Sequence, residues 1–192
     1  MRLDHALSWS ARRKRTGFLF RSVGRLGSPW AVAGEGVLAA LAMRGQPPRA
    51  VSIALAGPIA IGVGKLVKRI ISRRRPGLAR FRHNGHESFP STHVAGQTAL
   101  LACLVRHSPG TPAWRLALTA AGAVALVTAF ERVRESRHWP TDVAAGAVLG
   151  TLVGCAVGLV AQKATLERQR STLSPAPLPA AQITRAAPSQ AL

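Results

Sequence analysis

An uncharged apolar stretch at residues 143–161 constrains the fold of this chain more than any other feature. It contains no Asp, Glu, Lys, Arg or His and is built mainly of Ala, Val, Gly and Leu. As a helix it would rise about 28 Å, close to the roughly 30 Å thickness of a bilayer's hydrocarbon core. We therefore expect a transmembrane helix here.

Four further apolar stretches accompany it, at residues 29–43, 50–67, 90–105 and 112–130. A helix needs roughly 17 to 25 residues to cross a bilayer, so the first and third fall short unless flanking residues extend them. Soluble core helices are the alternative for these two. With short connections between them, the five stretches predict an all-α membrane bundle of about five transmembrane helices over residues 28–165.

The composition agrees with helices that pack closely in a bilayer. Hydrophobic residues make up 47% of the chain, which has 18 Gly and no Tyr. Small residues let helix backbones approach one another where the hydrophobic effect does not drive association. Cys103 and Cys155 both lie inside apolar stretches, so we interpret them as small buried hydrophobes and expect neither a disulfide nor a metal site.

The chain is strongly basic, with 26 Lys and Arg against 7 Asp and Glu. In a soluble protein this charge would indicate nucleic-acid binding. Here the cations fall in blocks separated by apolar stretches, which favours loops that face anionic lipids and substrate phosphates, with no nucleic-acid partner. Residues 1–27 are predicted to form a basic interfacial segment, with a solvated tail as the alternative. Residues 166–192 are predicted to be a disordered tail rich in Pro, Ala and Ser.

Three basic residues at the ends of the apolar stretches are candidate phosphate ligands. Lys68 and Arg75 border the loop between the second and third stretches, and Arg132 borders the loop between the fourth and fifth. In an up-and-down bundle both loops emerge on one side, so these cations converge. Phosphate suits such a site, because Arg donates in a bidentate manner and Lys offers a point charge. The alternative is a set of positive loop residues that only determines topology.

Proline positions suggest where two of the helices begin. Pro90 and Pro140 each stand where a first helical residue is expected. Ser91, Thr92 and His93 would then lie in the first turn of the third helix, whose free backbone N–H groups attract an anion.

A second histidine precedes the fifth helix, with a carboxylate four residues later. His138 and Asp142 have the spacing at which the carboxylate can accept from one ring nitrogen and leave the other to attack phosphorus. His93 can then protonate the leaving oxygen. Either histidine alone is more often structural, so the prediction depends on their combination with the three cations.

Together these residues resemble the type-2 phosphatidic-acid phosphatase superfamily, which includes the vanadium haloperoxidases. Its signature is Lys-x6-Arg-Pro, then Pro-Ser-Gly-His, then Ser-Arg-x5-His-x3-Asp. The first motif is matched in full by residues 68–76. The second is matched at residues 90–93, except that Thr92 replaces Gly. The third is matched at residues 131–142, except that Glu131 replaces Ser.

The resemblance implies a role for each matched residue. His138 is the nucleophile that forms a phosphohistidine, Asp142 orients it, and His93 protonates the leaving group. The residues implied to hold phosphate are Lys68, Arg75, Ser91, Thr92 and Arg132. Phosphatases of this family need no metal, so we expect no metal and no cofactor. Thr92 keeps its backbone N–H but narrows the site, and Glu131 either pairs with the neighbouring Arg132 or points away from it.

The expected function is metal-independent hydrolysis of a lipid phosphate. Phosphatidate, a prenyl phosphate or pyrophosphate, and a polyprenyl-phosphoryl sugar phosphate remain open as substrates, and the oligomeric state is open as well. One alternative is a non-enzymatic membrane protein that binds anionic lipid or nucleic acid through basic loops. Another is a vanadate-dependent haloperoxidase, although the resembling proteins of that kind are large and soluble.

Charge counting makes a prediction about topology in the cell membrane. With five spans, 18 of the Lys and Arg residues lie on the side of the candidate site and 8 on the other side. The positive-inside rule then places the site at the cytoplasmic face. The resemblance argues for the opposite face, because many family members act on the outer surface.

Overall fold

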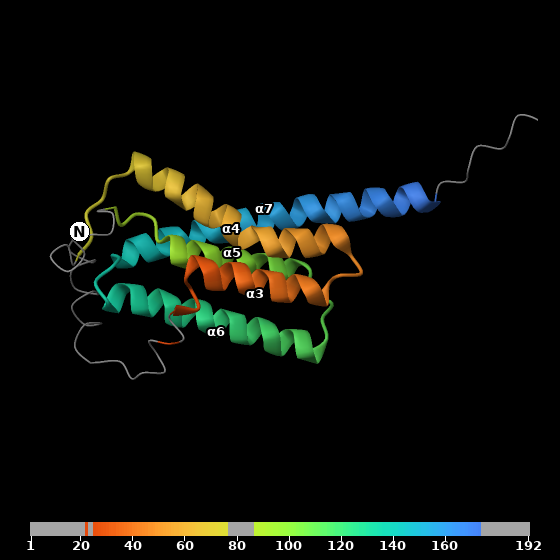
Figure 1. Cartoon of the computed structure of the whole chain (residues 1–192), viewed down its shortest axis with the longest axis horizontal. Coiled ribbons are helices and arrows are strands. Elements are labelled where there is room, and N and C mark those ends of the chain that lie inside the picture. Colours follow the sequence, from red (N-terminus) through yellow and green to blue (C-terminus); the bar gives the residue numbers. More distant parts are fainter. Residues whose placement is uncertain (1–21, 23–24, 77–86, 174–192) are drawn as a thin grey trace, which may run out of the picture.

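The computed structural model describes residues 22, 25–76 and 87–173, and within them the chain is helical without a strand. The five helices are α3 (Pro29–Ala42), α4 (Pro47–Ile70), α5 (Thr92–Arg106), α6 (Pro112–Arg134) and α7 (Pro140–Leu173). They run alternately up and down the long axis of the molecule (Figure 1). The predicted all-α bundle is therefore confirmed. Most of the N-terminal segment at 1–27 and the tail from 174 onward lie outside the described residues.

Helix α5 occupies the middle of the bundle and packs against all four other helices. Its residues Ala95 and Ala99 are fully buried and belong to the hydrophobic core. Glycines on α7 permit a very close approach to them: a Cβ added at Gly150 would lie 2.2 Å from the Ala95 carbonyl oxygen, and one at Gly154 would lie 2.2 Å from that of Ala99. The small residues noted in the sequence thus bring the backbones of α5 and α7 together.

Three helices, α4, α6 and α7, are long and apolar enough to cross a membrane. Helix α3 has 14 residues and α5 has 15, so flanking residues do not extend these two stretches to full spanning length. The prediction that Pro90 begins the third helix is wrong, because α5 starts at Thr92 with Ser91 as its N-cap. Helix α5 is largely enclosed by protein, and such a helix does not need to match the bilayer thickness.

Helix α7 ends later than composition suggested. It continues to Leu173, past the domain boundary placed at residue 165. The additional turns contain Glu167, Arg168, Gln169 and Arg170, which favour a helix although they are polar. The helix-forming tendency of these residues therefore extends α7 beyond its apolar stretch.

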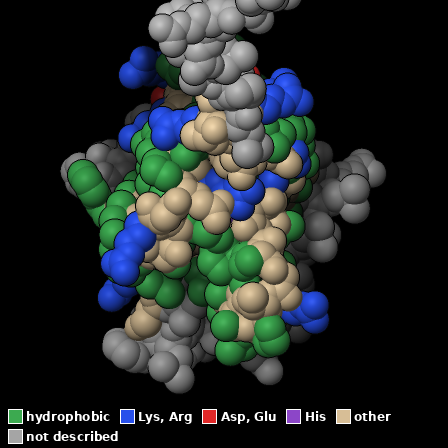
Figure 2. All heavy atoms as spheres, turned by 90° about the vertical axis from the view of Figure 1, so that its right-hand side faces the viewer, with side chains coloured by type: hydrophobic (Ala, Val, Ile, Leu, Met, Phe, Trp, Pro, Cys, Tyr) green, Lys and Arg blue, Asp and Glu red, His purple; other side chains and the backbone are tan. Residues whose placement is uncertain are grey.

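The bundle has two distinct ends. The α4–α5 and α6–α7 connections meet at one end, whereas the α3–α4 and α5–α6 connections lie at the other (Figure 1). Figure 2 faces the latter end, where Lys and Arg side chains surround and interrupt apolar surface. The convergence of the two loops that carry the candidate site residues follows from this alternation.

Candidate active site

The starts of α5 and α7 are joined at one end of the bundle. The Ser91 backbone N–H donates to the Asp142 carbonyl oxygen at 2.9 Å. An added Cβ at Gly146 would lie 2.5 Å from the Ser91 carbonyl oxygen, so glycine is required for this close approach. The Ser91 hydroxyl is buried and has no hydrogen-bond partner among the described residues. Two helix N-termini thus lie side by side, each with backbone N–H groups that favour an anion.

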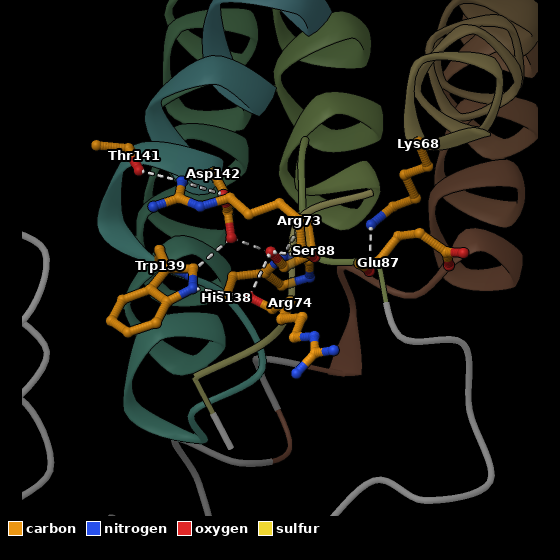
Figure 3. A network of polar contacts seen from close by, with 9 residues as sticks. All are labelled: Lys68, Arg73, Arg74, Glu87, Ser88, His138, Trp139, Thr141 and Asp142. Carbon is orange, nitrogen blue, oxygen red and sulfur yellow. Dashed lines mark hydrogen bonds and ion pairs between the residues drawn. The ribbon is translucent and has the colours of Figure 1, made fainter. Parts of the chain in front are cut away.

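His138 is held in one orientation by a backbone carbonyl. Its Nδ1 lies 2.7 Å from the Ser88 carbonyl oxygen, and its side chain is almost fully buried (Figure 3). A carbonyl only accepts, so Nδ1 carries the proton and Nε2 keeps its lone pair. Asp142 Oδ2 is 3.8 Å from the same nitrogen, which is an electrostatic contact rather than a hydrogen bond. The hydrogen bond that orients the ring was expected to be accepted by Asp142, but in this structure it is accepted by the Ser88 carbonyl oxygen.

Asp142 is itself fixed by several donors. Arg73 Nη1 donates to Oδ1 at 2.7 Å, and the Trp139 backbone N–H donates to Oδ2 at 2.8 Å. Arg73 also donates to Thr141 Oγ1 at 2.6 Å and lies over the Trp139 ring, 5.6 Å from its centroid (Figure 3). These contacts tie the segment after α4 to the first turn of α7. The positive charge of Arg73 thereby compensates the negative charge of the fully buried Asp142 carboxylate.

The environment of His138 favours the neutral imidazole. Burial lowers the pKa of His138, and the positive charges of Lys68 and Arg75 lower it further, while the contact with Asp142 opposes this shift. Lys68 Nζ donates to the Glu87 carbonyl oxygen at 3.1 Å, which brings the end of α4 next to the segment that holds the ring. A neutral ring with a free Nε2 is the form that acts as a nucleophile.

His93 and Arg132 line a cavity beside His138. The cavity measures about 280 Å³ and is also bordered by Arg25, Ser28 and Arg137. Burial, followed by the positive charge of Arg132, lowers the pKa of His93 to about 3. Its Nδ1 is buried and has no hydrogen-bond partner within the described part of the chain. The His93 ring thus lines the cavity with one nitrogen that no described residue hydrogen-bonds.

Thr92 does not fill the site in the way its branched side chain suggested. Its methyl group packs against α4 at Gly64, where an added Cβ would lie 2.9 Å from it. The glycine makes room for the methyl group, and the backbone N–H of Thr92 stays in the first turn of α5.

All eight residues singled out in the sequence therefore lie at one end of the bundle. Sequence reasoning missed two contributors, Ser88 and Arg73. Ser88 acts through its carbonyl oxygen, which no side-chain pattern marks. Arg73 belongs to a run of three arginines, and nothing in the run distinguishes it from Arg74. Within residues 25–76 and 87–173, no three His, Cys, Asp or Glu side chains are grouped as metal ligands would be.

Comparisons with known proteins identify the family of the chain. Residues 49–166 match the family model described as the PAP2 superfamily. A decaprenylphosphoryl-5-phosphoribose phosphatase of Mycobacterium tuberculosis, found in two strains, is 33% identical over 108 residues. This match covers 53% of the chain, which spans about half the length (55%) of these curated relatives.

Two solved structures share the fold. The PAP2-type phosphatidylglycerolphosphate phosphatase of Bacillus subtilis aligns with a TM-score of 0.69 and 25% identity, covering 84% of this chain and 85% of that one. Aquifex aeolicus LpxE aligns with a TM-score of 0.64 and 19% identity, covering 84% of this chain and 95% of that one. The second likeness bears on the fold alone.

Proposed function

Because the chain belongs to the PAP2 superfamily, we propose that it is a membrane phosphatase that hydrolyses a lipid phosphate through a phosphohistidine at His138. The observation that carries the proposal is the buried His138 ring, whose Nδ1–H donates to the Ser88 carbonyl oxygen, which leaves Nε2 without a partner among the described residues. Cations and two helix N-termini surround it. An arrangement of this kind stabilises the charge on a phosphoryl group in the transition state.

The reaction proceeds in two steps. In the first, the negative charge of the bound phosphate favours the protonated form of His93. His138 Nε2 attacks phosphorus, the bond to the ester oxygen breaks, and His93 gives its proton to the leaving oxygen. In the second, His93 accepts a proton from water, which attacks the phosphohistidine and releases inorganic phosphate and free His138. Lys68, Arg75 and Arg132, with the N–H groups at Ser91 and Thr92, neutralise the phosphoryl oxygens in both steps.

The substrate is a phosphate monoester carried on a lipid. Helices α4, α6 and α7 place the site at the end of a bundle suited to a bilayer, where a lipid-borne headgroup can reach it. The curated relatives are named for a phosphate on a polyprenyl-linked ribose, which supports a polyprenyl-phosphoryl sugar phosphate among the possible substrates. Phosphatidate and prenyl phosphates are the other members of the class.

The direct test is release of inorganic phosphate by the purified full-length protein in detergent. The panel comprises a polyprenyl-phosphoryl ribose 5-phosphate, phosphatidylglycerol phosphate, phosphatidate and a prenyl phosphate. We expect turnover of at least one of them in the presence of EDTA, and none with His138→Ala. Absence of turnover across the panel, or equal turnover by the variant, would refute the proposal. A protein that only binds anionic lipid would give the first of these results.

We also propose that the site faces the cytoplasm, because the sequence count with five spans assigns 18 Lys and Arg residues to the side of the site and 8 to the other side. Gly45 lies exposed in the α3–α4 connection at the opposite end, with open space around it. A Gly45→Cys variant, made in a background without Cys103 and Cys155, should react with an impermeant thiol reagent in intact cells. Reaction only after permeabilisation would place the site on the outer face.

A further inference from the structure

Glu131 stands out within the cavity beside His93. It is one of the two acidic residues that line the cavity, and it is 1% exposed. Its Oε1 is buried and has no hydrogen-bond partner among the described residues. The other acid, Glu135, is paired with Arg137 at 2.8 Å and is partly exposed. A buried carboxylate oxygen without a hydrogen bond destabilises the protein. We therefore expect a ligand that enters the cavity to donate a hydrogen bond to it.

The charges around Glu131 narrow the chemistry of that donor. The cavity is lined by three arginines, Arg25, Arg132 and Arg137. Arg132 interacts electrostatically with Glu131. A cationic ligand would be repelled by these three arginines. A neutral hydroxyl group, in contrast, donates to a carboxylate and brings no charge of its own.

The wall of the cavity opposite α6 is fixed in place. A Cβ on Gly27 would lie 2.2 Å from the Thr128 methyl group, so the segment before α3 packs tightly on α6. Gln97 donates to the Leu26 carbonyl oxygen and to Glu35 Oε2, both at 2.9 Å. These contacts hold the backbone between Arg25 and Ser28, two residues that line the cavity, against α6.

We infer that this cavity receives the leaving alcohol of the substrate and that Glu131 accepts a hydrogen bond from a free hydroxyl group on it. His93, the proposed proton donor to the leaving oxygen, lines the same cavity, which puts the alcohol on this side of the phosphate. Sugar and glycerol phosphates carry such hydroxyl groups, whereas a plain prenyl phosphate carries none. Glu131 is thus a specificity-determining residue. The inference rests on the proposed phosphatase function.

The test compares two substrates in the full-length protein. The ratio of kcat/KM for a polyprenyl-phosphoryl ribose 5-phosphate to kcat/KM for a prenyl phosphate measures the selectivity for a hydroxylated leaving alcohol. A hydrogen bond to a charged group predicts that Glu131→Ala lowers this ratio by about 10- to 100-fold. Glu131→Gln keeps one acceptor oxygen and should lower it less. Glu167→Ala, an exposed acid on α7, is the matched control and should leave the ratio at the wild-type value.

The outcomes separate the two proposals. If wild-type protein releases no phosphate from either substrate, the proposed function fails. If it turns over both and Glu131→Ala keeps the wild-type ratio, only the inference about Glu131 is overturned. Circular dichroism shows whether Glu131→Ala folds. If it does not, the isosteric Glu131→Gln is the test variant. A ratio of the two kcat/KM values that is unchanged in Glu131→Gln also overturns the inference.

Discussion

Each end of α5 has a histidine near a serine, yet the two ends differ in how their polar atoms are hydrogen-bonded. At the far end, the Ser52 hydroxyl donates to the Arg49 carbonyl oxygen at 2.7 Å, so His107 Nε2 donates to Ser52 Oγ at 3.0 Å, with Cys103 beside them. This small network consists of groups that satisfy one another. The Ser52 hydroxyl already donates its hydrogen bond to a carbonyl oxygen, so His107 does not act as a base toward Ser52.

At the other end, the fold leaves groups incomplete. Ser91 Oγ and His93 Nδ1 are buried without a partner in the described chain, and both lie close to converging cations. Buried polar groups are nearly always paired in proteins, so the exceptions indicate where a ligand completes the network. The comparison teaches that a buried histidine near a serine is not in itself a reactive centre. What distinguishes the candidate site is the unsatisfied hydrogen-bonding capacity.

The largest expected effect is the contrast between the histidines of the two ends. His138→Ala should lower kcat on a lipid phosphate by about 10⁴-fold or more, because it removes the proposed nucleophile. His107→Ala should cost about 1–3 kcal/mol of stability by leaving Ser52 without its donor, and should keep kcat within about threefold. Phosphate release and thermal unfolding in detergent measure the two effects. Comparable losses of kcat in both variants would remove the distinction between the ends.

A somewhat smaller effect is expected at Asp142. Asp142→Asn should lower kcat by about 10²- to 10⁴-fold, because it removes the negative charge beside His138 and leaves one oxygen to accept from the two donors, Arg73 and the Trp139 N–H. The Ser88 carbonyl still binds Nδ1–H, so the loss should stay below that of His138→Ala. Steady-state kinetics, with circular dichroism to confirm folding, provide the measurement. A folded variant with an unchanged rate would show that the carboxylate only fastens the start of α7.

His93→Ala should sharpen the assignment of the general acid. A lipid alcohol is a poor leaving group, so its phosphate should be hydrolysed about 10²- to 10³-fold more slowly. An activated aryl phosphate needs little protonation and should lose much less. The measurement is the ratio of the two losses. Equal losses on both substrates would assign His93 to phosphate binding instead of proton transfer.

The smallest expected effect is a shift in pH dependence. The nucleophile must be neutral, and burial lowers the pKa of His138, so the neutral form persists as the pH falls below 6.5. Activity should therefore decline only at more acidic pH, when the ring becomes protonated. Asp142 favours the protonated ring, so Asp142→Asn should move the acidic limb of kcat/KM to still lower pH. A limb that moves upward in the variant would contradict this electrostatic account.

The sequence predicted the bundle well because its signals are local. Apolar stretches bounded by charges located all five helices, and Pro112 and Pro140 begin α6 and α7. The errors also have local causes. Ser91 acts as an N-cap, which moves the start of α5 beyond Pro90, and polar helix-forming residues carry α7 to Leu173. A boundary drawn from apolar character alone does not detect either effect.

The candidate site was predictable only where side chains form a pattern. Lys68, His93 and His138 were found because charged and histidine residues recur at fixed spacing at helix ends. The role of Ser88 was not predictable, because a backbone carbonyl is common to every residue. The bond from Arg73 to Asp142 depends on tertiary structure that brings together residues 69 positions apart.

The central claim is that phosphate passes through His138, and the most direct test is to isolate the intermediate. A phosphate-labelled lipid substrate is mixed with stoichiometric enzyme, quenched with alkali within milliseconds, and digested for peptide mapping. The account predicts label on the peptide that contains His138, stable to alkali and lost in acid, and absent from His138→Ala. Rapid phosphate release without labelled protein at any quench time, or label on a different residue, would contradict it.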